Sequence, residues 1–157
     1  MTNADLEKIV DTSDQWILER TGIRERRIAD ETISCADMAT EAARNAMAMA
    51  NCAPEDVEMI IDATVTPDYT LPSNGCLIQE KLGLVNAVAF DIVAACTGFI
   101  NGLTIARGFI ESGMHKKIVV IGSEKLSSFT NWNDRTTCVL FGDAAGAVVV
   151  EPSTDGT

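Results

Sequence analysis

Apolar segments alternate along this chain with stretches of helical periodicity, and this pattern restricts the possible folds more than any other feature. The apolar segments that predict strands are residues 59–65, 88–93, 118–121 and 147–150. Strands that are apolar on both faces are typical of a mostly parallel sheet with helices on both sides. The sequence therefore predicts an α/β domain.

Helix-capping residues stand between the predicted strands. Ser13 and Ser34 are candidate N-caps, and Asp37, three residues after Ser34, completes a capping box. Gly83 and Gly113 stand where helices are expected to end. The expected helices cover residues 4–10, 13–19, 34–50, 73–82 and 97–112, with a short extended segment at 23–28, a polar loop at 127–137 and a closely packed tight turn at 142–146.

The composition suits one globular domain and argues against several kinds of partner. The chain has 157 residues, of which 46% are hydrophobic, and a formal net charge of −11. Such an acidic surface repels nucleic acid and anionic membranes, so neither is an expected partner. No apolar run approaches the roughly 20 residues that cross a bilayer, and the polar, acidic N-terminus is unlike a secretory signal. We therefore expect a cytoplasmic protein.

The cysteines are scattered through the chain, at Cys35, Cys52, Cys76, Cys96 and Cys138. An odd number without a close pair predicts neither a disulfide framework nor a metal site, so we expect no bound metal. Four of the five are expected to be small buried hydrophobic residues.

Cys96 differs from the other cysteines because it stands where a predicted strand turns into a predicted helix. At a helix start, unpaired backbone N–H groups and the positive end of the helix dipole stabilise negative charge. Both favour the thiolate, the nucleophilic form of cysteine, and the same N–H groups can hold a developing oxyanion. A buried structural cysteine is the ordinary interpretation, but the strand–Cys–helix context favours a nucleophile.

The only histidine, His115, cannot serve Cys96 as a base. It lies past the far end of the predicted helix that Cys96 begins, and that helix spans about 15 residues, or roughly 22 Å. A general base must come within roughly 3 Å. His115 is therefore interpreted as a favourable charge at a helix C-terminus, and an imidazole that assists Cys96 has to come from outside this chain.

Trp16 and Arg20 lie four residues apart in a predicted helix and so share a face. A half-buried tryptophan with an arginine folded over it is the simpler interpretation. Alternatively, the indole and guanidinium groups form a flat platform for an aromatic base, and the arginine also suits a phosphate. Arg24, Arg26 and Arg27 add positive charge nearby and favour an anionic ligand.

Several motifs together resemble the β-ketoacyl-acyl-carrier-protein synthase III family, the condensing enzymes that start type II fatty acid synthesis. They comprise residues 11–17 and 20–26, the Pro72-Ser73 pair, residues 91–99, the Asp134-Arg135 pair and residues 141–143, in the family's order and spacing. The Trp-Ile-x-x-Arg-Thr-Gly-Ile-x-x-Arg block is quite specific to this family among thiolase-fold proteins. The Ala-Cys-x-Gly-Phe block is shared more widely.

The resemblance implies a thiolase-like α/β fold made of two similar halves. Residues 1–151 would form the N-terminal half, and residues 152–157 would begin the connection to a C-terminal half. The family's usual first strand would precede Asn3, where only Met1 and Thr2 stand. A homodimer is also implied.

The resemblance further implies roles for individual residues. Cys96 would accept the acyl group, and Leu71 would reach across the homodimer and limit acyl-chain length. The residues that match the coenzyme A site are Thr12, Trp16, Arg20 and Arg135, and those that match the acyl pocket are Leu71 and Phe141.

The implied reaction is an acyl transfer that initiates fatty acid synthesis. A short acyl-CoA would acylate Cys96, and decarboxylative condensation with malonyl-acyl-carrier protein would give 3-oxoacyl-carrier protein, CoA and CO2. No cofactor is implied, because the coenzyme A thioester is a substrate. Condensation would need a histidine and an asparagine from the C-terminal half, so the chain alone is expected not to condense. The acidic carrier protein would dock on a basic patch, either near residues 24–27 or on the other half.

Other functions remain open at this stage. The chain could be a non-catalytic truncated or dimerising half-domain. It could also belong to another thiolase-fold acyltransferase, such as a quinolone or polyketide starter enzyme, although the block around Trp16 and Arg20 argues against this. A cysteine hydrolase is the least favoured class, because the chain offers no base to Cys96.

Overall fold

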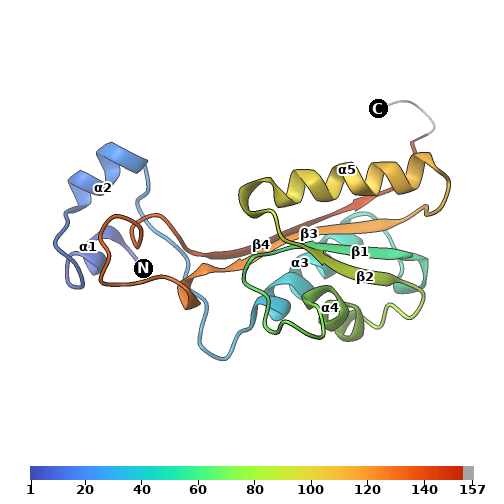
Figure 1. Ribbon diagram of the computed structural model, residues 1–157, viewed down its shortest axis with the longest axis horizontal. Helices are drawn as coiled ribbons and strands as arrows, with labels where there is room; N and C mark the ends of the chain where they lie inside the picture. The colour runs from blue at the N-terminus through green and yellow to red at the C-terminus, as the bar shows by residue number, and fades with distance from the viewer. Residues whose placement is uncertain (154–157) are drawn as a thin grey trace. The chain divides into compact units, whose positions relative to one another are not determined.

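The computed structural model describes residues 1–153 and consists of two compact units, each with its own core (Figure 1). The small unit comprises Met1–Ile33 and Lys125–Ala144, and the sheet unit comprises Ser34–Glu124 and Ala145–Thr157. The sequence predicted one domain, because nothing in its composition marks the boundary between the units. From residue 154 onward, the predicted connection over residues 152–157 lies outside the described residues.

A four-stranded sheet with strand order β2-β1-β3-β4 runs through the sheet unit. Its strands are β1 (Met59–Ala63), β2 (Val88–Ile92), β3 (Ile118–Lys125) and β4 (Asp143–Val150). β1 pairs in parallel with both β2 and β3, in a register that sets Asp62 beside Asp91. The predicted mostly parallel sheet is therefore confirmed for β1, β2 and β3.

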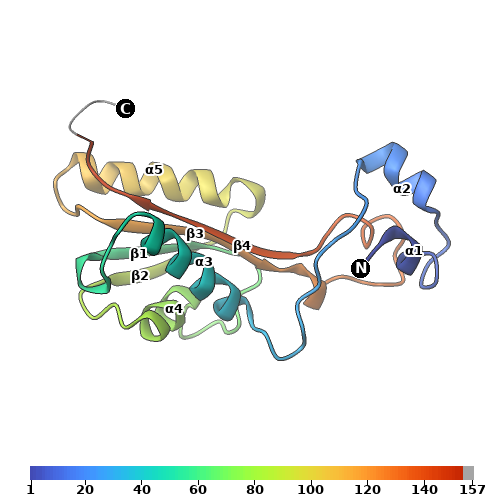
Figure 2. The same ribbon diagram turned by 180° about the vertical axis from the view of Figure 1, so that it is seen from behind.

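Helices cover both faces of this sheet (Figures 1 and 2). α3 (Cys35–Met49) and α4 (Asn74–Leu82) lie on one face, and α5 (Gly98–Glu111) lies on the other. Successive strand residues point to opposite faces, so Ile60 joins the core on the α3 side while Ile61 joins the core on the α5 side. The apolar character of both strand faces thus follows from burial on both sides.

The capping residues read from the sequence begin and end the helices as expected. Ser13 caps α2 (Asp14–Thr21), and Ser34 forms a capping box with Asp37 at the start of α3. Gly83 ends α4 with a φ of 68°, a left-handed conformation that glycine adopts without strain. No helix within residues 1–153 has the length and apolarity needed to cross a membrane.

The predicted tight turn over residues 142–146 is wrong, because β4 already begins at Asp143. The Ala-Ala-Gly-Ala run has weak strand propensity, but pairing beside β3 in the sheet outweighs that local preference. The predicted close packing is confirmed at Gly142, where a Cβ atom would lie 2.8 Å from the carbonyl oxygen of Arg27.

Other boundaries also differ from the prediction. α1 covers only Asn3–Leu6, because Thr2 caps it and the chain turns after one helical turn. β3 is longer than predicted and continues through polar residues to Lys125. The expected extended segment at 23–28 is reduced to a single antiparallel bridge between Thr2 and Glu25.

Candidate functional site

Cys96 lies in the connection between β2 and α5, within a 3-10 turn over Ala95–Thr97. α5 itself begins at Gly98, so the thiol stands just before the helix rather than in its first turn. Ala95 has a φ of 47°, in the left-handed region that residues with a Cβ atom rarely adopt. Backbone of this kind is concentrated at functional sites.

Cys96 is also the exposed cysteine of the chain. Cys76 is half-buried, and Cys35, Cys52 and Cys138 are buried. The prediction that most of the cysteines are buried hydrophobic residues is confirmed for these three. A reagent in solvent therefore reaches Cys96 more readily than the others.

Close packing between α5 and the sheet fixes the turn that carries Cys96. A Cβ atom on Gly98 would lie 3.0 Å from the Cβ atom of Ala63, and one on Gly102 would lie 2.8 Å from Cγ1 of Val120. These two glycines let the start of α5 approach β1 and β3 more closely than side chains would allow. The position of Cys96 therefore depends on the α5 backbone at these glycines packing against side chains of the sheet.

The N-terminal turn of α5 lacks the usual side-chain cap. Thr97 is its N-cap residue, but its hydroxyl donates to the Ala94 carbonyl oxygen at 2.8 Å and accepts only from the side-chain Nδ2 of Asn101 at 3.4 Å, so it caps no backbone N–H of the helix. The backbone N–H groups of Thr97 and Gly98 donate to the carbonyl oxygens of Ala94 and Ala95, and the N–H groups that follow in the first turn of α5 have no side-chain cap. They form the local environment in which an oxyanion would be stabilised.

His115 lies where the sequence predicted, at the opposite end of α5. The helix has 14 residues, which corresponds to roughly 21 Å along its axis. Its Nδ1 lies 3.4 Å from Oε2 of Glu58, and its ring packs edge-on against Phe109 with centroids 5.3 Å apart. The prediction that His115 cannot assist Cys96 is confirmed.

In the small unit, the guanidinium groups of two arginines lie over the indole ring of Trp16. Cζ of Arg20 lies 4.9 Å from the ring centroid, and Cζ of Arg135 lies 4.8 Å from it. Arg135 also faces Asp11, with 3.6 Å between Nη1 and Oδ2. Three of the four residues predicted for a coenzyme A site therefore meet at the Trp16 ring.

The fourth residue of this set, Thr12, precedes α2. Its hydroxyl oxygen is buried and has no hydrogen-bond partner among the residues that the structure describes. A buried hydroxyl without a partner is costly, and a ligand atom or a water molecule normally satisfies it. Thr12 is therefore compatible with a ligand contact at this place.

The two predicted acyl-pocket residues lie in different units. Leu71 belongs to the sheet unit, in the connection between β1 and α4, and is 84% exposed. Phe141 belongs to the small unit, is 40% exposed and lines a hollow of about 250 Å³. The chain by itself thus describes two separate parts of any acyl site.

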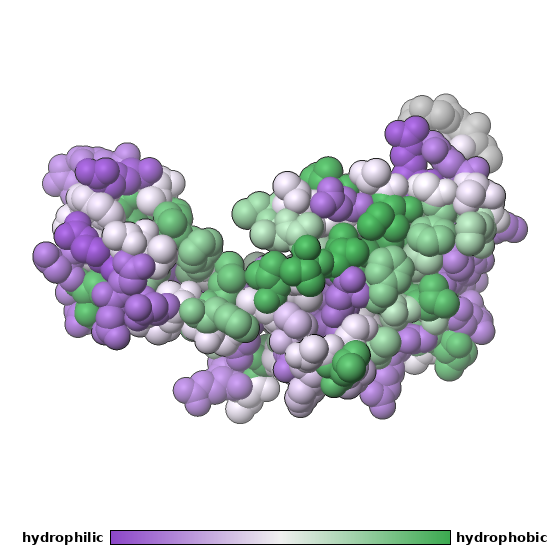
Figure 3. All heavy atoms as spheres, viewed as in Figure 1, coloured by the Kyte–Doolittle hydropathy of each residue, from purple (hydrophilic) through white to green (hydrophobic). Residues whose placement is uncertain are grey.

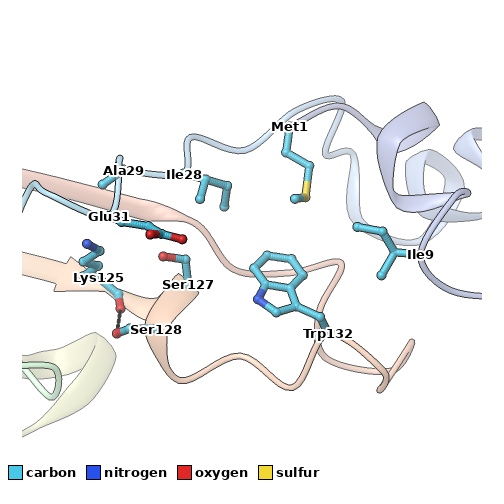
Figure 4. A pocket seen from close by; sticks show the side chains of 9 residues that line it. All are labelled: Met1, Ile9, Ile28, Ala29, Glu31, Lys125, Ser127, Ser128 and Trp132. Atoms are coloured by element: carbon cyan, nitrogen blue, oxygen red, sulfur yellow. Dashed lines mark hydrogen bonds between the residues drawn. The ribbon is translucent and has the colours of Figure 1, made fainter.

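A larger hollow of about 520 Å³ in the small unit contains none of the predicted site residues (Figure 4). Trp132, Ile9 and Met1 point toward one another across it. Lys125, on its rim, donates to the carbonyl oxygens of Asp30 and Ile33. Its polar residues, Glu31, Lys125, Ser127 and Ser128, lie together at one end of the hollow, away from Trp132.

The arginine-rich segment is less available than the sequence predicted. Arg26 is buried, and its Nη2 donates to Oδ1 of Asn3 at 2.9 Å and to the Val139 carbonyl oxygen at 3.0 Å. Arg27 pairs with Glu25 at 2.8 Å. The expectation of an anion-binding patch here was wrong for Arg26, which holds parts of the small unit together.

No role was predicted for Asp62, which is fully buried in β1. Its carboxylate accepts from Nδ2 of Asn74 at 2.7 Å and from Oγ of Ser123 at 2.9 Å. Loss of solvent raises the pKa of Asp62 to about 7, although these two hydrogen bonds oppose the shift. The available signal was a carboxylate in an otherwise apolar strand.

The chain is similar in sequence and fold to known proteins. A family model for 3-oxoacyl-[acyl-carrier-protein (ACP)] synthase III matches residues 90–157. The β-ketoacyl-[acyl-carrier-protein] synthase III of Caldanaerobacter subterraneus subsp. tengcongensis is 59% identical over 150 residues, which are 96% of this chain and 45% of that relative. The crystal structure of 3-oxoacyl-[acyl-carrier-protein] synthase III from Aquifex aeolicus matches with a TM-score of 0.96 and 57% identity, over 99% of this chain and 50% of that one.

Over the residues that these matches cover, this chain is similar to members of the β-ketoacyl-acyl-carrier-protein synthase III family. The predicted thiolase-like α/β fold is thereby confirmed. The chain spans about half the length of the curated relatives it matches. A priming β-ketosynthase from a polyketide biosynthetic pathway has the same fold, with a TM-score of 0.95 but only 36% identity.

Proposed function

We propose that the protein to which this chain belongs is an acyltransferase that initiates fatty acid synthesis as a 3-oxoacyl-acyl-carrier-protein synthase III. The observation that carries the proposal is the exposed thiol of Cys96 in a strained turn before α5. Relatives that are 59% and 57% identical to this chain over 150 aligned residues are named for this activity. The Trp16 surface supports the same conclusion, since it suits a nucleotide.

In the first step, the Cys96 thiolate attacks the carbonyl carbon of a short acyl-CoA. Main-chain N–H groups near the start of α5 hold the oxyanion that forms. The tetrahedral intermediate collapses, the C–S bond to coenzyme A breaks, and coenzyme A leaves as its thiolate. The acyl group stays on the Cys96 sulfur as a thioester. No cofactor takes part, because coenzyme A enters as part of the substrate.

In this proposal the small unit binds coenzyme A. Trp16 and Arg20 stack on the adenine, Arg135 contributes a second cationic group, and Thr12 lines the same site. The contacts of both guanidinium groups with the indole support this role. The primer length accepted by the acyl pocket depends on Leu71 and Phe141, together with walls that other parts of the protein supply.

The second step is condensation with malonyl-acyl-carrier protein. Its malonyl group loses CO2, the resulting carbanion attacks the acyl-cysteine carbonyl carbon, and the Cys96 thiolate leaves. Donors that hold the enolate oxygen would be a histidine and an asparagine from a C-terminal half. His115 cannot replace that histidine, because it lies at the opposite end of α5 from Cys96.

Docking of the carrier protein is assigned to surfaces outside this chain. Two locations were expected for the docking site. In the patch near residues 24–27, Arg26 is buried and Arg27 forms an ion pair with Glu25, so this patch offers less free positive charge than expected. The chain as a whole carries a net charge of −11, which repels an acidic partner. A cytoplasmic location is part of the same proposal.

A homodimer is proposed, with β2 at the interface. β2 is the terminal strand on one side of the sheet, and Val85, Val88 and Val93 around it are 84%, 51% and 75% exposed. Figure 3 shows apolar surface in the region between β2 and α5. An unpaired apolar edge of this kind favours pairing with another strand.

Two other functions are alternatives to this proposal. A polyketide or quinolone starter enzyme is supported by the matching fold of the priming β-ketosynthase, although its identity is lower. A non-catalytic half-domain would keep the fold without acyl transfer.

The test of the proposed function is incubation of the full-length protein with acetyl-CoA and malonyl-acyl-carrier protein. We expect acetoacetyl-carrier protein from the full-length protein and none from the 157-residue chain alone. A Cys96→Ala variant of the full-length protein should form none either. Product from that variant would overturn the proposal, and product from the chain alone would overturn the need for a second half.

A further inference from the structure

Leu71 lies in a loop that is held in place by hydrogen bonds at other residues of the loop and at the start of the next helix. The loop spans residues 64–73, between β1 and α4, and is called the Leu71 loop below. The Leu71 side chain is 84% exposed, so its own packing contributes little to its placement. Whatever holds the two ends of the loop therefore determines where this side chain stands.

The first part of the Leu71 loop is held by two carboxylates. Glu124, near the end of β3, accepts from the backbone N–H of Val65 at 2.9 Å and from the hydroxyl of Thr66 at 2.6 Å. Asp68 accepts from two backbone N–H groups at the start of α3, at 2.8 and 3.1 Å. This end is therefore tied to both β3 and α3.

The second end is held by Asn74, the first residue of α4. Its Nδ2 donates to Oδ2 of the buried Asp62 at 2.7 Å, and its backbone N–H donates to Asp91 at 2.7 Å. Its Oδ1 accepts from the backbone N–H of Asp68 at 3.4 Å. Asn74 thus joins the end of the Leu71 loop to the sheet and also holds Asp68 in the middle of the loop.

The pair of Asp62 and Asn74 is sealed from solvent. Both side chains are 0% exposed, and Ser123, which completes the contacts of Asp62, is 1% exposed. Removing one partner of a buried polar pair leaves the other without its hydrogen bond, which costs far more than removing both. Asp62 and Asn74 therefore form a rigid attachment point for the loop, and each needs the other as its hydrogen-bond partner.

We propose that Asp62 and Asn74 are positioning residues that fix the Leu71 loop and thereby set the length of the acyl chain that the protein accepts. The inference rests on the proposed function, which gives Leu71 its place in the acyl pocket. Asn74 stands three residues after Leu71, so loosening this anchor lets the Leu71 backbone move and enlarges the space for the acyl chain.

The experiment measures kcat/KM of the full-length protein for acetyl-CoA and butyryl-CoA. Leu71→Ala serves as the reference for an enlarged pocket. Asn74→Ala is expected to raise the butyryl to acetyl ratio by roughly tenfold or more in the same direction, since one methylene group in a pocket changes discrimination by about 10- to 200-fold and butyryl is longer than acetyl by two such groups. The conservative variant Asp62→Asn keeps an acceptor for Asn74 and should leave the ratio unchanged.

Two further variants separate positioning from stability. D62V/N74A removes both polar partners and leaves no unpaired carboxylate, so it should fold even if Asn74→Ala does not, and it should raise the ratio similarly. Val57→Ala trims a fully buried core side chain just before β1 and should lower the melting temperature without changing the ratio.

The outcomes distinguish this inference from the proposed function. If Leu71→Ala raises the ratio but neither variant at Asn74 does, the inference is wrong and the role of Leu71 stands. An equal change in Val57→Ala would also overturn the inference, because general destabilisation would then explain it. An unchanged ratio in Leu71→Ala would overturn the proposed role of Leu71, and the inference with it.

Discussion

The guanidinium group of Arg135 lies over the indole ring of Trp16, with its Cζ 4.8 Å from the ring centroid. Arg20 lies 4.9 Å from the same centroid, so the ring has two cationic neighbours. A cation over an aromatic face is attracted to it, and flat guanidinium groups also stack on nucleobases. The proposed binding of the coenzyme A adenine therefore rests on these two contacts in the small unit.

Replacing Trp16 with alanine should weaken acyl-CoA binding more than it slows acylation. Base stacking on an aromatic side chain is worth about 1–3 kcal/mol, so KM for acetyl-CoA should rise roughly tenfold or more in Trp16→Ala. Steady-state kinetics of the full-length protein measure this. Acetyl-pantetheine lacks the nucleotide, and its KM should stay unchanged.

Gln15→Ala is the matched control on the same helix, because Gln15 is exposed and pairs only with Glu19 among the described residues. Its KM for acetyl-CoA should equal that of the unaltered protein. Equal effects of Trp16→Ala on both thioesters would exclude a role for Trp16 at the nucleotide.

Cys96 should be alkylated before the other cysteines. It is exposed, whereas Cys35, Cys52 and Cys138 are buried, and alkylation needs contact with the reagent. Limited treatment of the folded protein with iodoacetamide, followed by peptide mass analysis, gives the order of labelling. Labelling of Cys35 or Cys138 as fast as Cys96 would contradict the activated, accessible thiol.

Asp62 should make the protein less stable as the pH rises. Its pKa is raised from 3.8 to about 7 in the folded state by burial. Between these values the unfolded chain releases the proton while the folded protein keeps it, so the stabilising contribution is complete below pH 3.8 and lost by about pH 7. A shift of this size corresponds to at most about 4 kcal/mol.

The Asp62→Asn variant isolates this contribution. The pKa values of Asp37 and Asp134 are lowered by hydrogen bonds, so they act in the opposite direction at acid pH in both proteins. The difference in unfolding free energy between variant and parent, measured by urea denaturation, should shift in favour of the variant from pH 5 to pH 8. A difference that does not change with pH would show that Asp62 is ionised when folded.

Alanine substitutions at Gly102 and Gly108 in α5 should change the unfolding free energy in opposite directions. A Cβ atom on Gly102 would lie 2.8 Å from Cγ1 of Val120, so Gly102→Ala should cost about 1–3 kcal/mol of unfolding free energy. Gly108 has no neighbouring atom within 4 Å of such a Cβ, so Gly108→Ala should stabilise the helix by up to about 1 kcal/mol. Thermal unfolding measures both changes, and a similar sign for the two would refute the packing of α5.

Much of the sheet unit could be predicted because its local signals agree with its packing. Ser34 and Asp37 cap α3, Gly83 ends α4, and the apolar residues of β1 face two helical layers. β4 was partly mistaken for a turn, since its small residues carry no strand preference and only its place beside β3 defines it.

Some residues of the candidate site could likewise be predicted from the sequence, and others could not. The exposed thiol of Cys96 follows from a strand–helix junction that periodicity reveals. Trp16 and Arg20 share a helix, so their contact was predictable, whereas the arrival of Arg135 on the same ring depends on tertiary structure. Burial of Arg26 could not be read from a charged segment, and Asp62 gave only the weak signal of one carboxylate in an apolar strand.

Mass spectrometry of the full-length protein after brief incubation with acetyl-CoA, in the absence of malonyl-acyl-carrier protein, tests the central claim most directly. We predict a single acetyl group, mapped to the peptide that contains Cys96 and absent from Cys96→Ala. An unmodified Cys96, or an acetyl group that persists in the variant, would contradict the claim that this thiol accepts the acyl chain.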